Sequence, residues 1–241
     1  MEIVILAAGK GSRFGKGSIQ NKCFIKINKQ TLIEKIIHDA KKLNIYKIKM
    51  IIGHNALNVK KKLVKYKLNF LYNKFFKVKD MMYSLKLAFN NQKEDMIILY
   101  SDIYFSDKIL KKLIARLDKS EFRNNICLPI KSNWKSVWKK RNKEIIDDCE
   151  SLIYKKNDLK DIGSKIKNIK NVMGQYMGII YFPSTKKKKI LNIIKKINID
   201  KMHITEFLNL LIKKSIPIKI VKTDDFWYEF DDLADLKNFH D

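Results

Sequence analysis

The sequence is poor in cysteine, proline and glycine, and it has no long hydrophobic run. Its 241 residues include three Cys, three Pro and eight Gly. Cys23, Cys127 and Cys149 are odd in number and lack the C-x-x-C spacing of zinc and redox motifs. No apolar stretch approaches the roughly 20 residues that a membrane-spanning helix needs. These shortages exclude a disulfide scaffold, a cysteine-ligated zinc site and membrane insertion, and they predict reduced thiols in a cytoplasmic protein.

Arginine is also scarce, although the chain is strongly basic. Lys and Arg number 51 against 25 Asp and Glu, a net charge of +26, yet only four of the 51 are Arg. A surface that grips nucleic acid is expected to use more Arg, whose guanidinium makes bidentate contacts with phosphate and guanine. The 37 Ile and 20 Asn beside only seven Ala point instead to the base composition of an AT-rich genome. We therefore expect most lysines to be solvated, and we expect no nucleic-acid partner.

Apolar runs alternate with helical patterns through residues 1–130. Thr31 precedes apolar residues at helical spacing, with Glu34 three positions on, which predicts a capped helix. Strands are expected at Glu2–Ala8, Ile48–Gly53, Leu68–Tyr72, Met96–Leu99 and Ile126–Ile130. Of these, the apolar runs at Glu2–Ala8 and Met96–Leu99 are typical of strands buried on both faces. Further helices are expected at Ala56–Tyr66, at Ser84–Phe89 and from a cap at Asp107 to Leu117. This βαβ order predicts an α/β fold whose sheet is mostly parallel.

Residues 131–241 have a looser pattern. Short antiparallel strands are expected between Leu152 and Lys167, and longer strands at Gln175–Phe182 and Ile216–Lys222. Helices are expected at Thr185–Lys196, at Ile204–Lys214 and after Asp231. No proline-rich linker or repeat divides the chain. The sequence therefore predicts a single domain with two halves, residues 1–130 and residues 131–241.

A glycine-rich turn follows the first expected strand. It reads Gly9-Lys10-Gly11-Ser12-Arg13, and Lys22 lies nine residues beyond Arg13. Glycine permits close approach and positive φ, so such a turn can direct several backbone N–H groups at one anion, and the two cations add donors. The phosphate-binding motif G-x-x-x-x-G-K-[ST] is absent from the turn. The motif G-x-G-x-x-G is incomplete, because Phe14 stands where its third glycine would be. A plain tight loop is the alternative, but the cations favour a phosphate-binding turn.

The turn resembles a motif of the nucleotidyltransferases that act on sugar phosphates and small alcohol phosphates. Residues 6–13, Leu-Ala-Ala-Gly-Lys-Gly-Ser-Arg, are similar to the family's L-A-A-G-x-G-x-R. Three later segments also resemble elements of this family. Residues 80–85 resemble its N-M-x-x-S-L element, residues 100–102 resemble its aspartate at the end of a strand, and residues 227–231 resemble its W-x-E-[IV]-D element. Asn21 stands before Lys22 where the family usually has Pro, and Asp80 replaces an Asn. Residues 148–152 and 174–178 are most similar to the phosphocholine and phosphonate cytidylyltransferase branch.

The resemblance implies a fold and a separate binding function for each half of the chain. The fold is a Rossmann-like three-layer one, with helices on both faces of a mostly parallel mixed sheet and a small antiparallel insertion on the acceptor side. Residues 1–130 are implied to be the nucleotide-binding half and residues 131–241 the acceptor-binding half of one nucleotidyltransferase domain.

The family's reaction then suggests a role for each charged residue. An acceptor oxygen attacks the α-phosphorus of a triphosphate and expels pyrophosphate, so charge must be neutralised and no protein nucleophile is needed. The resemblance makes Lys22 and Arg13 catalytic, the first at the α-phosphate and the second at the leaving pyrophosphate. It makes Mg²⁺ the cofactor, with Asp102 and Asp231 as ligands. The structural alternatives are a turn residue for Asp102 and a helix cap for Asp231.

The remaining predicted contacts are with the nucleotide and the acceptor. The nucleotide-binding set is Leu6, Ala7, Ala8, Gly9, Gly11, Ser12, Arg13, Asp80 and Ser84. The acceptor-binding set is Asp148, Glu150, Gln175, Tyr176, Trp227 and Glu229, and Trp134 and Trp138 lie in the same half. Aromatic and acidic side chains suit an acceptor with an ammonium group. Packing is the alternative for the aromatic residues and a helix cap for Ser84, and the isolated His54 and His203 are expected to be structural.

These observations favour a CTP-dependent cytidylyltransferase. It would join CMP to a small acceptor of the phosphocholine, 2-aminoethylphosphonate or phosphorylated amino acid or amide type, in surface polysaccharide or phosphonate biosynthesis. The first alternative is a sugar-1-phosphate nucleotidyltransferase that uses UTP, dTTP or CTP. The second is a basic nucleic-acid-binding module on a degenerate version of the fold. The expected partners are CTP and the anionic acceptor, and neither nucleic acid nor membrane insertion is expected. The sequence is compatible with a homodimer.

Lys22→Ala is predicted to lower kcat by about 10²–10³, because the transition state loses one preorganised donor. Steady-state turnover of the purified, folded variant measures the effect. Turnover close to that of the wild type would remove Lys22 from catalysis.

Overall fold

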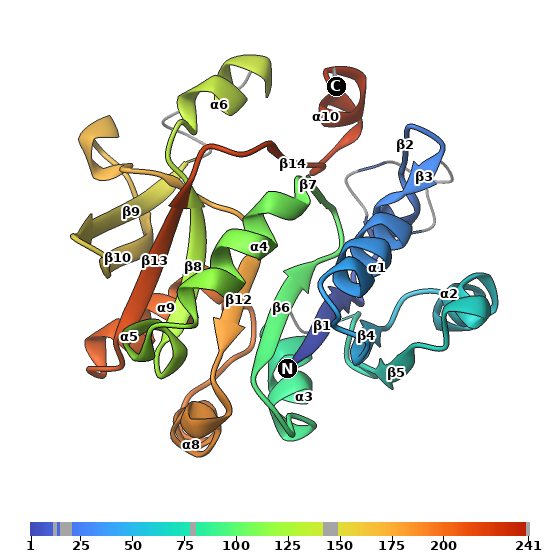
Figure 1. Ribbon diagram of the computed structural model, residues 1–241, viewed down its shortest axis with the longest axis horizontal. Helices are drawn as coiled ribbons and strands as arrows, with labels where there is room; N and C mark the ends of the chain where they lie inside the picture. The colour runs from blue at the N-terminus through green and yellow to red at the C-terminus, as the bar shows by residue number, and fades with distance from the viewer. Residues whose placement is uncertain (12–13, 15–20, 78–80, 142–148, 240–241) are drawn as a thin grey trace. The chain divides into compact units, whose positions relative to one another are not determined.

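The fold divides the chain into two units that alternate along the sequence. The computed structural model (Figure 1) describes residues 1–11, 14, 21–77, 81–141 and 149–239. Unit 1 consists of residues 1–103 and 181–203, and unit 2 of residues 104–180 and 204–241. The assignment of nucleotide to residues 1–130 and acceptor to residues 131–241 is a division of function, and it stays a prediction.

Four parallel strands form a sheet in unit 1, in the order β5-β4-β1-β6 (Figure 1). They are β1 (Glu2–Ala7), β4 (Ile48–Ile52), β5 (Asn69–Tyr72) and β6 (Met96–Tyr100). Every residue of β1, β4 and β6 is buried, as expected of parallel strands with covered faces. Leu6 of β1 is in register with Ile51 of β4 and Tyr100 of β6. The three strands therefore end level, and the turns that follow them lie at one edge of the sheet.

The first helix of unit 1 begins with the predicted capping box. Thr31 Oγ1 accepts a hydrogen bond from Glu34 N at 3.3 Å, and Glu34 Oε2 accepts one from Thr31 N at 3.1 Å. The bond from the Thr31 backbone, followed by one from the Tyr66 hydroxyl, lowers the pKa of Glu34 to about 2. The helices of unit 1 are α1 (Leu32–Lys42), α2 (Ala56–Leu63), α3 (Met81–Asn90) and α8 (Lys187–Lys195). Its short elements are η2 (Lys22–Phe24), η3 (Val64–Tyr66), η5 (Ser184–Lys186), β2 (Lys26–Ile27) and β3 (Gln30–Thr31).

Unit 2 contains a mixed sheet. In it β8 (Ile126–Lys131) is parallel to β13 (Ile218–Thr223) and antiparallel to β11 (Gln175–Tyr176). The antiparallel pair β9 (Glu150–Lys155) and β10 (Asp158–Lys165) is the predicted small insertion, and β10 also pairs with β13. The other strands are β7 (Ile103–Phe105), β14 (Trp227–Glu229) and β12 (Ile179–Phe182), along which the chain passes back to unit 1. The helices are α4 (Asp107–Arg116), α5 (Ser120–Arg123), α6 (Lys135–Arg141), α9 (Ile204–Lys213), α10 (Leu233–Lys237) and η4 (Ile169–Asn171).

Two local predictions were wrong. The strand predicted over Gln175–Phe182 is interrupted, because Gly178 has φ +71° and separates β11 from β12. The cap of α4 is Ser106 rather than Asp107, since Ser106 Oγ accepts from Lys108 N at 3.4 Å. Asp107 is the first helical residue, where its carboxylate still favours the positive end of the helix dipole.

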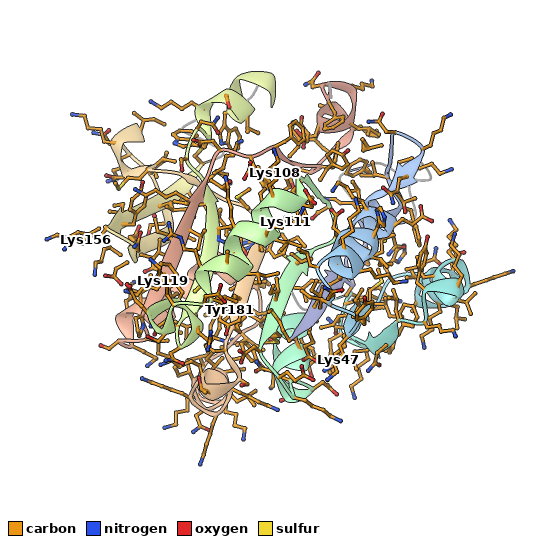
Figure 2. All side chains as sticks on the ribbon, viewed as in Figure 1. Lys47, Lys108, Lys111, Lys119, Lys156 and Tyr181 are labelled. Atoms are coloured by element: carbon orange, nitrogen blue, oxygen red, sulfur yellow. The ribbon has the colours of Figure 1, made fainter. Side chains whose placement is uncertain are left out.

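Among the described residues, all but two lysines are exposed or partly buried, as expected of solvated lysines. Figure 2 labels Lys47, Lys108, Lys111, Lys119 and Lys156, all of which are exposed.

The two exceptions are buried and bound to oxygen atoms. Lys49 Nζ lies 2.6 Å from Glu2 Oε2 and donates to Asn91 O at 2.6 Å. Lys131 Nζ donates to the carbonyls of Asp224 and Asp225 at 2.7 Å each, and burial lowers the pKa of Lys131. Within the described part of the chain, no helix is long and apolar enough to cross a membrane.

Thr31→Ala is predicted to lower the free energy of unfolding by about 1 kcal/mol, because Glu34 N loses its capping acceptor. Urea denaturation followed by circular dichroism measures the loss. Thr185→Ala, at an exposed position of η5, is the control and should change the free energy by less than about 0.5 kcal/mol. Equal losses in the two variants would contradict the role of the cap.

Candidate active site

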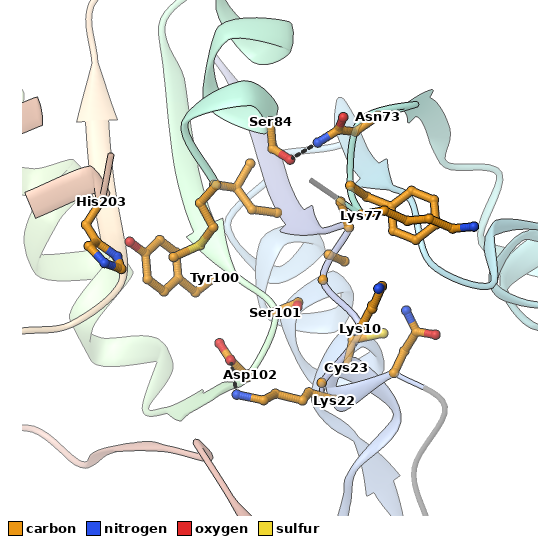
Figure 3. A pocket seen from close by; sticks show the side chains of 18 residues that line it. Lys10, Lys22, Cys23, Asn73, Lys77, Ser84, Tyr100, Ser101, Asp102 and His203 are labelled. Carbon is orange, nitrogen blue, oxygen red and sulfur yellow. Dashed lines mark hydrogen bonds and ion pairs between the residues drawn. The ribbon is translucent and has the colours of Figure 1, made fainter. Parts of the chain in front are cut away.

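A cavity of about 390 Å³ opens in unit 1 where β1 and β6 end (Figure 3). Its lining comprises residues 6–11, 21–23, 73, 76, 77, 81, 84, 100–102 and 203. Ligands of open parallel sheets bind at this edge, because the loops after the strands leave room there. The cavity therefore brings together most of the nucleotide-binding residues predicted from the sequence, namely Leu6, Ala7, Ala8, Gly9, Gly11 and Ser84, with Lys22 and Asp102.

An ion pair lies in the lining of this cavity. Lys22 Nζ donates to Asp102 Oδ2 at 2.9 Å, and the two side chains are 12% and 20% exposed. Lys22 begins the short helix η2, whereas Asp102 follows β6. The predicted catalytic cation and the predicted metal ligand are therefore neighbours, both still reachable from solvent.

The two glycines of the turn after β1 differ in their surroundings. A Cβ atom on Gly9 would meet no atom of the described residues within 4 Å. Gly11 has φ +63°, and a Cβ atom there would lie 3.4 Å from Lys22 Cγ. Gly9 therefore leaves the backbone open to a close-approaching ligand, and Gly11 makes the bend of the turn.

Ser84 lies inside α3 rather than at its cap. Helix α3 begins at Met81, and Ser84 Oγ accepts a hydrogen bond from Asn73 Nδ2 at 3.0 Å. Asn73 Oδ1 in turn accepts from Phe75 N at 2.9 Å. The alternative of a helix cap for Ser84 was thus wrong, and Asn73 is a cavity residue that the sequence analysis missed. The position of Asn73 directly after β5 could have indicated this, because polar residues that follow parallel strands meet at one edge of the sheet.

Two further lining residues, His203 and Cys23, have side chains that can be reactive in other proteins. His203 was expected to be structural, but its side chain is exposed and lines the cavity beside Tyr100 (Figure 3). Cys23 is buried, and burial together with the nearby charge of Asp102 raises the pKa of its thiol to about 12. The Cys23 thiol is therefore neutral at physiological pH and is not a nucleophile.

Comparison with known proteins identifies the family. The sequence model described as "MobA-like NTP transferase domain" matches residues 3–167. The chain belongs to this nucleotidyltransferase family. It is 28% identical over 259 aligned positions to the CTP:phosphoglutamine cytidylyltransferase of Campylobacter jejuni, with 98% of each chain covered. The resemblance of the sequence motifs to nucleotidyltransferases is thus confirmed, and the protein is an enzyme of the transferase class.

Solved structures confirm the predicted Rossmann-like α/β fold. The CTP:phosphocholine cytidylyltransferase of Streptococcus pneumoniae is similar with a TM-score of 0.70 at 19% identity, over 98% of this chain and 96% of that one. A putative glucose-1-phosphate thymidylyltransferase of Bacillus anthracis is similar with a TM-score of 0.77 at 19% identity, over 98% and 92%.

The second predicted metal ligand of the nucleotidyltransferase, Asp231, belongs to unit 2. Asp231 N donates to Asp235 Oδ2 at 2.7 Å, and Asp235 is completely buried. Asp232, not Asp231, is the N-cap of α10, because its Oδ1 accepts from Asp235 N at 3.0 Å. The alternative of a cap role for Asp231 was therefore wrong, and its role as a metal ligand stays a prediction.

The acceptor-binding set also belongs to unit 2. Glu150 begins β9 and is exposed, Gln175 and Tyr176 form β11, and Glu229 ends β14. Trp227 is 2% exposed, and its Nε1 donates to Met177 O at 2.9 Å. Trp227 is thus packed in the interior, and the acceptor contacts of the whole predicted set, Trp227 included, stay predictions.

Two other tryptophans of this half are also packed. Trp134 and Trp138 are 3% and 4% exposed and form a hydrophobic cluster with Cys149, Ile166 and Val172. Four predicted site residues, Ser12, Arg13, Asp80 and Asp148, lie outside the described residues.

The donor chemistry of Asp102 fits Mg²⁺. This ion prefers oxygen ligands and is usually held by one or two carboxylates, with phosphate oxygens and water completing its shell. Among the described residues, no group of three or more His, Cys, Asp and Glu side chains forms a metal cluster. A nucleotidyltransferase site does not require one, because the triphosphate itself brings oxygen ligands.

Gly9→Ala is predicted to weaken nucleoside triphosphate binding without destabilising the fold. The added methyl group meets no atom of the residues that the structure describes, but it occupies the space through which a phosphate would approach the backbone. We expect the KM for the triphosphate to rise about tenfold, equivalent to roughly one lost hydrogen bond, in steady-state assays.

Gly53→Ala is the matched comparison, because its methyl group would lie 2.5 Å from Phe76 Cβ and 2.9 Å from Ala8 O. This variant should lose stability in urea denaturation, whereas Gly9→Ala should not. An unchanged KM in Gly9→Ala would contradict the phosphate-binding turn.

Proposed function

We propose that this nucleotidyltransferase transfers CMP from CTP to a small phosphorylated or phosphonate acceptor and releases pyrophosphate. The observation that carries the proposal is the Lys22–Asp102 pair, at 2.9 Å, in a cavity whose lining includes the glycine turn. The similarity to CTP:phosphoglutamine cytidylyltransferase, over 98% of both chains, supports CTP as the nucleotide and a small phosphorylated acceptor.

In the proposed reaction, an acceptor oxygen attacks the α-phosphorus as the bond to the β-phosphate oxygen breaks. Negative charge gathers at the α-phosphate, where the Lys22 ammonium stabilises it. The neutral Cys23 thiol, whose pKa is about 12, takes no part as a nucleophile, so the transfer is direct. When bound, Mg²⁺ supplies further charge neutralisation; Asp102 would hold it, and Asp231 is the second ligand that the sequence predicts.

The nucleotide is proposed to lie along the cavity of unit 1. The turn with Gly9 and Gly11 faces the triphosphate with its backbone N–H groups, and Arg13 is proposed to contact the leaving pyrophosphate. At the end of β5, the amide of Asn73 and the hydroxyl of Ser84, 3.0 Å apart, offer both donors and acceptors to the base or ribose. Each part of the nucleotide thus has polar groups of suitable chemistry.

The acceptor is proposed to carry an ammonium or amide group besides its phosphate or phosphonate. Glu150, Gln175, Tyr176 and Glu229, with Asp148, are the residues of unit 2 proposed to bind it. Carboxylates and an aromatic ring suit a cationic group through ionic and cation–π contacts. A cytoplasmic location belongs to the same proposal, supported by three cysteines that are buried and free of disulfides.

A sugar-1-phosphate nucleotidyltransferase is the second candidate. The observation that favours it is the likeness in fold to the putative glucose-1-phosphate thymidylyltransferase, with a TM-score of 0.77. The two candidates share the attack on the α-phosphate and differ in the base and the acceptor.

Pyrophosphate release is predicted with CTP and a small zwitterionic or amide-bearing acceptor. The assay pairs each of CTP, UTP, dTTP, ATP and GTP with phosphocholine, 2-aminoethylphosphonate, phosphoglutamine and glucose 1-phosphate, at fixed Mg²⁺. We expect kcat/KM with CTP to exceed that with any other triphosphate at least about tenfold, a difference of roughly 1.4 kcal/mol.

Asp102→Asn is the control, and its loss of activity would assign the release to this cavity. Release with UTP or dTTP and glucose 1-phosphate would instead support the second candidate. If no combination released pyrophosphate and the protein bound RNA in a salt-sensitive manner, a nucleic-acid-binding module would be supported.

A further inference from the structure

Asn21 occupies the position before Lys22 where proline is usual in the family that the sequence resembles. Its backbone has φ −153° and ψ 131°. A proline ring fixes φ near −65°, so proline cannot adopt the conformation that this chain has at residue 21. The start of the turn that carries Lys22 must therefore be held by other means.

The side chain of Asn21 makes a contact that holds this segment. Asn21 is 2% exposed, and its Nδ2 donates to His54 O at 3.3 Å. His54 N in turn donates to Ala8 O at 3.0 Å. These bonds connect the turn after β1, the turn after β4 and the segment that begins η2. All of these residues belong to unit 1.

The backbone of η2 connects Asn21 to the Lys22–Asp102 ion pair. Phe24 N donates to Asn21 O and Ile25 N to Lys22 O, at 3.0 Å each, which closes the turn of η2. Lys22 leaves this turn with its Nζ 2.9 Å from Asp102 Oδ2. A shift of Asn21 would therefore move the base of the Lys22 side chain.

Fold stability gives little reason for an asparagine at this position. Its Oδ1 is buried and has no hydrogen-bond partner among the described residues. A buried acceptor without a partner loses its hydration with no compensation, which offsets the bond that Nδ2 gains. Among the described residues the amide therefore makes one hydrogen bond to the fold, while its position next to Lys22 gives it a geometric effect on the site.

We propose that Asn21 is a positioning residue for Lys22. Its amide, bonded to the His54 carbonyl, fixes the start of η2 and so the place of the Lys22 ammonium beside Asp102. The inference rests on the proposed function only for the catalytic role of Lys22, since the position of the ammonium can be measured without turnover.

Asn21→Ala is expected to lower kcat about tenfold, because small displacements of a catalytic group are costly. The KM for CTP should stay within about twofold, and the midpoint of urea denaturation should not fall. Asn91→Ala is the matched control. It also removes an amide donor to a backbone carbonyl, Leu87 O at 2.9 Å, but outside the cavity, and its kcat should equal that of the wild type.

A double-mutant cycle separates positioning from a general effect on the fold. Asn21→Ala should have no further effect on kcat in the Lys22→Ala background, because the residue acts through Lys22. Additive losses would overturn the inference. Asn21→Pro should lose at least as much activity as Asn21→Ala, and wild-type turnover in that variant would also overturn it.

Crystal structures of the variants provide a test that needs no activity. In Asn21→Ala the distance from Lys22 Nζ to Asp102 Oδ2 should exceed 4 Å, the usual limit of an ion pair, and in Asn91→Ala it should remain near 2.9 Å. A pair still intact in Asn21→Ala would overturn the inference even in an enzyme active with CTP. A displaced pair in an enzyme inactive with every triphosphate would uphold the positioning role and refute only the proposed function.

Discussion

The level register of β1, β4 and β6 is the constraint on which the site depends. Leu6 is paired with Ile51 on one side and with Tyr100 on the other, and all three strands are buried. A slip of either neighbour would move its following turn away from the glycine turn by at least one residue, roughly 3.3 Å. Burial of apolar side chains therefore fixes the relative positions of polar groups that make no contribution to the core.

The cavity holds groups of opposite charge where the anionic triphosphate is proposed to bind. Lys22 is paired with Asp102 in the free protein, and their attraction offsets part of the desolvation cost of the partly buried ammonium. The same carboxylate has the chemistry to share a divalent cation with phosphate oxygens. One short ion pair thereby places the proposed catalytic cation and the proposed metal ligand at adjacent positions.

We propose that only a small part of the net charge of +26 acts in substrate binding. The cavity lining contains Lys10, Lys22 and Lys77, whereas the lysines labelled in Figure 2 lie on exposed surface. A positive potential attracts triphosphate, acceptor and pyrophosphate alike. In the proposed reaction, the positions of these three lysines would therefore matter more than the total number of lysines in the chain.

The sequence by itself determined the parallel strands, the Thr31 capping box and the glycine turn after β1, because each depends on residues close together in the chain. It also pointed to Lys22 and Asp102, through motif order. Only the tertiary structure decided that Asn73, His203 and Asn21 line the same cavity, since contacts over 30 to 180 residues leave no local pattern. It likewise decided that Asp232 caps α10 and that Trp227 is buried, because capping and burial depend on backbone direction and on neighbours that the sequence does not specify.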